Sequence, residues 1–177
     1  IFTDCDVILH CIEDDFKTFL DKSYYKSVHN NSCEHRYYFP QGPVMFFHKN
    51  PLVNIEHYNY YVRCVERFRT IIKQPDAKLF TMFYHNNSKV DETLRNKIID
   101  FNSKLSKYIS NYKLMVVFHI DKNNKQYHEF TQEDNIDFLE LHTLSYSDGV
   151  RFQYNQDNQY LDNIIKTRYN FNLLNIS

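Results

Sequence analysis

The stretch PVMFFHKNPLVNIEHYNYYVRCVERFRTIIKQPDAKLFTMFYH, residues 43–85, decides the predicted fold. Its two ends, residues 43–48 and 79–85, are apolar runs that each close on a histidine, as expected of strands buried on both faces. Between them, from about Asn54 to Lys73, apolar residues recur at intervals of three and four, which indicates an amphipathic helix that Pro75 ends. The stretch therefore predicts a strand, a crossover helix and a second, parallel strand.

The rest of the chain continues this alternation of helices and strands. We expect a first helix from Thr3 or Asp4 to about Leu20, an aromatic-rich hairpin or long loop over residues 22–39, and a helix that opens at Ser88 or Asp91. A strand over 114–120, a polar segment over 121–135, a strand over 136–143 that is an edge strand or has one solvated face, and a last helix over about 157–169 should follow. These elements predict an α/β fold, a mainly parallel sheet with crossover helices, as a single domain over residues 1–177. Because the chain opens on Ile1 rather than Met, we expect it to lack an N-terminal segment.

The composition argues against several classes of function. The net charge is -1 with acidic and basic residues interspersed, which argues against a nucleic-acid-binding surface, and no apolar run approaches the roughly 20 residues of a membrane span. With only Gly42 and Gly149, phosphate-binding loops built from several glycines are excluded. The four cysteines are irregularly spaced and form no CxxC pair, and the histidines show no metal-ligand spacing. We therefore expect no metal, reduced thiols and an intracellular location, while the oligomeric state stays open.

Polar residues gather at the predicted carboxyl ends of the strands, where open α/β sheets bind ligands. These ends carry His48, His85, His119 with Asp121, and His142. Two arginines are candidates for binding an anionic group of a substrate: Arg67 on the central helix and Arg151 after a turn at residues 148–151. For Arg67 the alternative is ordinary ion pairing on the surface. No cysteine stands out as a nucleophile, because none combines a helix N-terminus or a neighbouring imidazole with a favourable charge environment.

Several short motifs resemble an uncharacterised family of bacterial and viral proteins that is labelled papain-like cysteine peptidases. They are DVILHCIEDDFKTFL at 6–20, Phe46-Phe47-His48, YVRCVERF at 61–68 followed by Lys78-Leu79-Phe80, and KLMVVFH at 113–119. The resemblance covers roughly residues 3–120 and implies that His48 is a general base. The family's cysteine precedes the first of these motifs, so its counterpart would lie before Ile1, and Lys49 follows His48 where the family usually has an acidic residue.

The resemblance and the strand ends together predict a cysteine-type acyltransferase or hydrolase. Its substrate would be a small molecule or a glycan, with a coenzyme A thioester as one acyl donor that the resemblance implies. The predicted catalytic residues are His48, His85 and Asp121. One alternative is a non-catalytic module that binds a sugar or a protein through residues 24–39, with Tyr37 and Tyr38 in the contact surface. Another is a nucleotide-sugar-binding, glycosyltransferase-like domain, although the chain has no glycine-rich loop.

Overall fold

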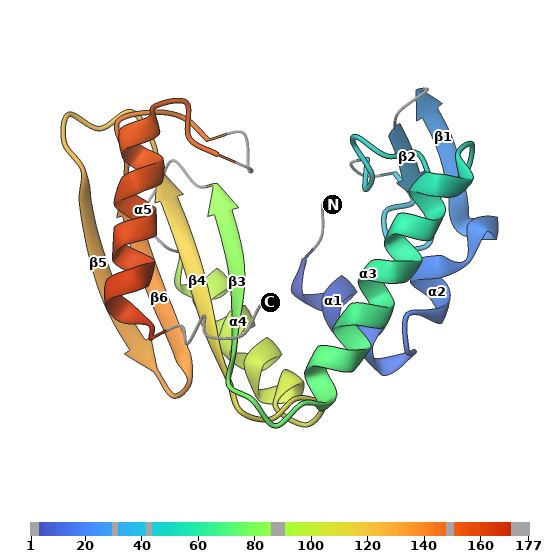
Figure 1. The fold of residues 1–177 in the computed structure, drawn as a ribbon, viewed down its shortest axis with the longest axis horizontal. Helices are drawn as coiled ribbons and strands as arrows, with labels where there is room; N and C mark the ends of the chain where they lie inside the picture. Colours follow the sequence, from blue (N-terminus) through green and yellow to red (C-terminus); the bar gives the residue numbers. More distant parts are fainter. Residues whose placement is uncertain (1–3, 30–31, 42–43, 86–90, 148–150, 171–177) are drawn as a thin grey trace, which may run out of the picture. The chain divides into compact units, whose positions relative to one another are not determined.

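The computed structural model describes residues 4–29, 32–41, 44–85, 91–147 and 151–170. It has a mostly parallel four-stranded sheet, several helices and a separate two-stranded antiparallel sheet, which confirms the predicted α/β class (Figure 1). The chain folds as two compact units, Ile1–Asp76 with Asn96–Asn111, and Ala77–Arg95 with Tyr112–Ser177. The expectation of a single domain stays a prediction.

The first unit packs its helices against a short hairpin. Its elements are α1 (Cys5–Glu13), α2 (Lys17–Leu20), the 3-10 helix η1 (Lys22–Tyr24), β1 (Tyr25–His29), β2 (Ser32–His35), α3 (Ile55–Lys73) and most of α4 (Glu92–Leu105). The antiparallel pair of β1 and β2 confirms the expected hairpin, and α3 begins after its cap Asn54, as the sequence predicts. The prediction of one continuous helix to about Leu20 is wrong, because Asp15 and Phe16 adopt left-handed backbone angles that separate α1 from α2.

The prediction of a strand at residues 43–48 is also wrong. Within the described residues 44–48, Phe46 forms only an isolated bridge with Cys33, and no strand is present. Met45 and Phe46 are buried in the aromatic core of the first unit, whereas Phe47 and His48 are exposed. The apolar run thus fills a core from an irregular segment instead of joining the sheet. The parallel strand–helix–strand unit of this protein is formed by β3 (Lys78–His85), α4 and β4 (Tyr112–Ile120).

The second unit contains the four-stranded sheet. Its strands are β3, β4, β5 (Tyr127–Glu133) and β6 (Ile136–His142), in the order β3-β4-β6-β5, and α5 (Asn155–Arg168) lies over one face (Figure 1). β6 runs parallel to β4 and antiparallel to β5. β5 lies in the predicted polar segment 121–135, and β6 is an inner strand, so the edge-strand alternative for residues 136–143 is wrong. The tight turn between β5 and β6 contains no glycine. Asp134 itself takes the left-handed backbone conformation there.

Helix α5 is held on the sheet by apolar packing and by hydrogen bonds near its end. Its apolar side packs on buried residues of β4 and β6, with Ile164 among Met115, Val117, Leu139 and Leu141. Near its end, Arg168 and Tyr169 bond the buried carboxylate of Asp137, at 3.0 Å and 2.8 Å. Because α5 follows β6 and turns back over the sheet, its N-terminus lies at the end where the parallel strands finish (Figure 1).

Candidate functional site

Two histidines meet at the carboxyl edge of the sheet in the second unit. His85 ends β3, and the parallel register sets it beside His119 of β4. Their Nδ1 atoms are 3.0 Å apart. The His119 side chain is fully buried, whereas that of His85 is 37% exposed and its Nε2 lies 4.0 Å from Oδ2 of Asp121. The sheet therefore brings together two of the three predicted catalytic residues, His85 and Asp121.

A chain of hydrogen bonds fixes the proton positions of the two imidazoles. The Thr143 hydroxyl donates to the carbonyl oxygen of Ser145 (2.7 Å), because a carbonyl can only accept. Thr143 Oγ1 must then accept the second bond, from Nε2–H of His119 (2.7 Å). A neutral His119 has no other N–H, so its Nδ1 accepts from Nδ1–H of His85. The other ring nitrogen of a neutral His85, Nε2, therefore carries no proton and lies as an acceptor beside Asp121.

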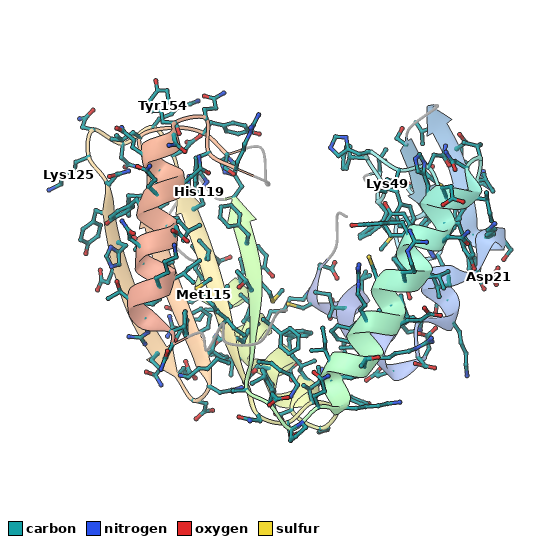
Figure 2. All side chains as sticks on the ribbon, viewed as in Figure 1. Asp21, Lys49, Met115, His119, Lys125 and Tyr154 are labelled. Carbon is teal, nitrogen blue, oxygen red and sulfur yellow. The ribbon has the colours of Figure 1, made fainter. Side chains whose placement is uncertain are left out.

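The environment of His119 keeps it neutral. Burial, and then the charge of neighbouring His85, lower the pKa of His119 from 6.5 to about 4. Figure 2 places His119 toward the end of its strand, above Met115. The ring lies among Phe83, His85 and Phe152, with centroids 5.0 to 5.5 Å away. A neutral, immobilised imidazole suits the role of orienting a second, exposed one.

This pKa predicts a loss of stability in mild acid. Both the folded and the unfolded chain hold His119 neutral above about pH 6.5. As the pH falls from there toward about 4, only the unfolded chain takes up the proton, so the free energy of unfolding is expected to fall by about 3 kcal/mol from this group. Urea unfolding across that range measures it, and His119→Asn should show a smaller slope. An equal slope in both proteins would contradict the assignment.

The segment that carries Thr143 and Ser145 is held by a buried carboxylate. Asp157 in the first turn of α5 accepts from the backbone N–H (2.9 Å) and the hydroxyl (2.6 Å) of Ser145, and from Gln126 Nε2 (2.7 Å). Burial raises the pKa of Asp157, but these hydrogen bonds outweigh it and keep the pKa below its ordinary value. The charged Asp157 carboxylate therefore holds the segment with Thr143 and Ser145 in place through several hydrogen bonds.

Aromatic rings flank the exposed imidazole. Tyr146 is 41% exposed, and its ring stands edge-on to that of His85 with centroids 5.2 Å apart. Phe83, on the same strand as His85, is also partly exposed. The exposed imidazole is therefore bordered by polarisable apolar surfaces, of the kind that suit the flat face of a sugar or an acyl chain.

Of the other predicted site residues, Arg151 belongs to the second unit, and the rest belong to the first: His48, Arg67, Tyr37 and Tyr38. His48 is exposed in the first unit, next to the ring of Phe47, so its role as a base stays a prediction. Arg67 is exposed on α3 and its Nη2 lies 3.2 Å from Sγ of Cys64. Tyr37 is 48% exposed, whereas Tyr38 is half-buried and bonds His10 and Cys11. Arg151 lines a cavity in the second unit.

Sequence reasoning missed the residues that orient His85. His119 was one of several strand-end histidines, and nothing marked Thr143 or Tyr146. One signal was available, since His119 interrupts the otherwise apolar run 114–120. A histidine at a buried strand position needs hydrogen-bond partners, which predicts a polar network around it.

Among the described residues, no three His, Cys, Asp or Glu side chains gather so that they would hold a metal ion, and no helix has the length and apolar character to cross a membrane. Comparison of the chain with protein-family models, curated proteins and solved structures gave no match. The family resemblance therefore stays a prediction, and the function is argued from the geometry.

Proposed function

We propose that this protein is a hydrolase or acyltransferase in which His85 is the general base. The observation that carries the proposal is the hydrogen-bond chain from Ser145 through Thr143 and His119, which leaves Nε2 as the acceptor nitrogen of His85, a side chain that is 37% exposed. This atom would take the proton from water or from the hydroxyl or thiol of an acceptor substrate as that group forms a bond to the acyl carbon of an ester or thioester. The protonated His85 would then give the proton to the leaving alcohol or thiol as the original acyl C–O or C–S bond breaks. Positioned bases of this kind typically accelerate a reaction about 10²–10⁴-fold.

Asp121 would assist the same step. Once His85 holds the proton, it is an imidazolium whose Nε2 faces the carboxylate of Asp121 at 4.0 Å. The Asp121 side chain is only 6% exposed, so water screens this attraction less than at the open surface. The carboxylate therefore stabilises the charge that forms on His85 during the reaction.

Burial makes three of the four thiols poor candidates for the nucleophile. Cys5, Cys11 and Cys33 are buried, and burial is the main cause that raises the pKa of Cys11 to about 11 and also raises that of Cys33. Cys64 lies on α3 in the first unit, beside Arg67. A thiol with a raised pKa is a poor nucleophile near neutral pH. The proposal accordingly assigns the attack to water or to an acceptor hydroxyl on a small-molecule or glycan substrate.

The test is turnover of two acyl donors by the intact chain. p-Nitrophenyl acetate reports hydrolysis of an activated ester, and acetyl-coenzyme A, with free thiol measured, reports transfer from a thioester to water or to an added sugar. Turnover of either donor that is lost in His85→Gln supports the proposal. Turnover that is unchanged in this variant, or no turnover of either donor above the uncatalysed rate, contradicts it.

A further inference from the structure

Tyr146 places a phenol beside the exposed imidazole of the second unit. Its ring centroid lies 5.2 Å from that of His85, and the residue is 41% exposed. The hydroxyl bonds no part of the chain that the structure describes. Three other tyrosines of this unit form a hydrogen bond between the hydroxyl and a neighbouring side chain: Tyr127 with Glu129, Tyr160 with His128 and Tyr169 with Asp137. The described fold therefore makes no use of the Tyr146 hydroxyl.

The backbone that carries Tyr146 is held on both sides. Ser145 is buried and donates to the carboxylate of Asp157 from its backbone N–H (2.9 Å) and from its hydroxyl (2.6 Å). Ser147 is buried as well, and the carbonyl oxygen of Tyr146 accepts from the backbone N–H of Gln153 (3.0 Å). A donor on such a fixed backbone keeps its place while charge develops in a bound substrate, which is the condition for stabilising that charge.

We propose that the Tyr146 hydroxyl donates a hydrogen bond to the acyl oxygen of the substrate and stabilises the negative charge that forms there. The inference rests on the proposed function, in which His85 takes the proton of the attacking group. As the new bond to the acyl carbon forms, one electron pair of the C=O bond moves onto the oxygen. That pair returns as the acyl C–O or C–S bond to the leaving group breaks, and the hydroxyl keeps its own proton throughout.

The surroundings of the base favour Tyr146 as this donor. The Thr143 hydroxyl already donates to a main-chain carbonyl oxygen (2.7 Å), and so does Nδ2 of Asn123 (2.7 Å). The carboxylate of Asp121 stabilises the imidazolium of His85, but it repels a negative charge on the substrate, so the acyl oxygen needs a separate donor. The attacking group stands one hydrogen bond, about 2.6–3.2 Å, from Nε2 of His85, which brings the acyl group under attack next to the phenol.

The experiment compares Tyr146→Phe with the unchanged chain in turnover of p-nitrophenyl acetate and of acetyl-coenzyme A. The variant keeps the ring and removes only the hydroxyl, so we expect kcat for the accepted donor to fall about 10²–10³-fold. KM should stay within about twofold, because a bond to the charged oxygen acts in the transition state and not in the bound substrate. Urea unfolding should give the same free energy of unfolding for both proteins, since the hydroxyl bonds none of the described residues.

Tyr154→Phe is the matched control. Tyr154 belongs to the same unit, is 55% exposed and precedes α5, and its side chain forms no cap bond with this helix, so kcat should not change. Equal losses in the two variants, an unchanged kcat in Tyr146→Phe, or a raised KM alone overturn the inference, and turnover that still depends on His85 then leaves the proposed function standing. No turnover of either donor, or turnover that survives in His85→Gln, refutes the proposed function and the role of Tyr146 together.

Discussion

Replacing His85 with glutamine is expected to lower turnover of an acyl donor about 10²–10⁴-fold. Glutamine occupies nearly the same space and can still donate to Nδ1 of His119, so the fold and the hydrogen-bond chain should survive. It has no basic lone pair, however, and cannot take the proton from the attacking group. The comparison of initial rates for the two proteins, with far-ultraviolet circular dichroism to verify folding, measures the effect.

His48→Gln is the matched variant for this experiment. Both histidines are exposed and close an apolar run, but His48 lies in the first unit, where the family resemblance assigns it the role of base. On our proposal, His48→Gln retains the rate within about twofold, whereas His85→Gln loses it. The opposite pattern would show that the resemblance identified the base correctly and that the sheet edge is structural.

Replacing Asp137 with alanine is expected to destabilise the second unit by about 2–3 kcal/mol. Asp137 is buried and accepts from Arg168 (3.0 Å) and Tyr169 (2.8 Å), with Lys113 at 3.4 Å. Burial by itself raises the pKa of Asp137, but the bonds from Arg168 and Tyr169 outweigh it and hold the pKa below its ordinary value. Without the carboxylate, half-buried positive groups lose their partner and the end of α5 is released from the sheet.

Urea denaturation near neutral pH measures this loss. Asp162→Ala is the control, because its pair with Lys166 is an exposed i,i+4 contact on the same helix and is expected to change stability by less than about 0.5 kcal/mol. The Asp137 contribution is present above the carboxyl's unfolded pKa and is lost as the pH falls through its lower folded pKa. Equal stabilities of the two variants would show that the buried cluster does not hold α5.

The sequence predicted the elements whose periodicity is strong. α3 with its Asn54 cap, β3 and β4 all follow the expected bounds closely, and the strand-end rule brought His85 together with Asp121. The strand at residues 43–48 failed because an apolar run is compatible with any buried conformation, and here Phe46 fills a core of aromatic rings. The β5–β6 hairpin was missed because Asp134 replaces the glycine that usually marks such a turn.

The orientation of His85 was beyond sequence reasoning for a different reason. It depends on side chains from three segments that only the folded sheet brings together: His119 on β4, Thr143 after β6 and Asp157 on α5. Each of these residues has an ordinary structural interpretation by itself. Their function follows from the direction of each hydrogen bond, which requires the distances between them.

The most direct test of the account is the tautomeric state of His119 and His85. Long-range ¹H–¹⁵N correlation spectra of histidine-labelled protein near pH 7 distinguish protonated from unprotonated ring nitrogens, and His119→Asn and His85→Gln assign the signals. We expect His119 to carry its proton on Nε2, with Nδ1 bare, and His85 to carry a proton on Nδ1. A His119 proton on Nδ1 would reverse the bond to His85, point the basic lone pair of His85 into the protein and contradict the proposed base.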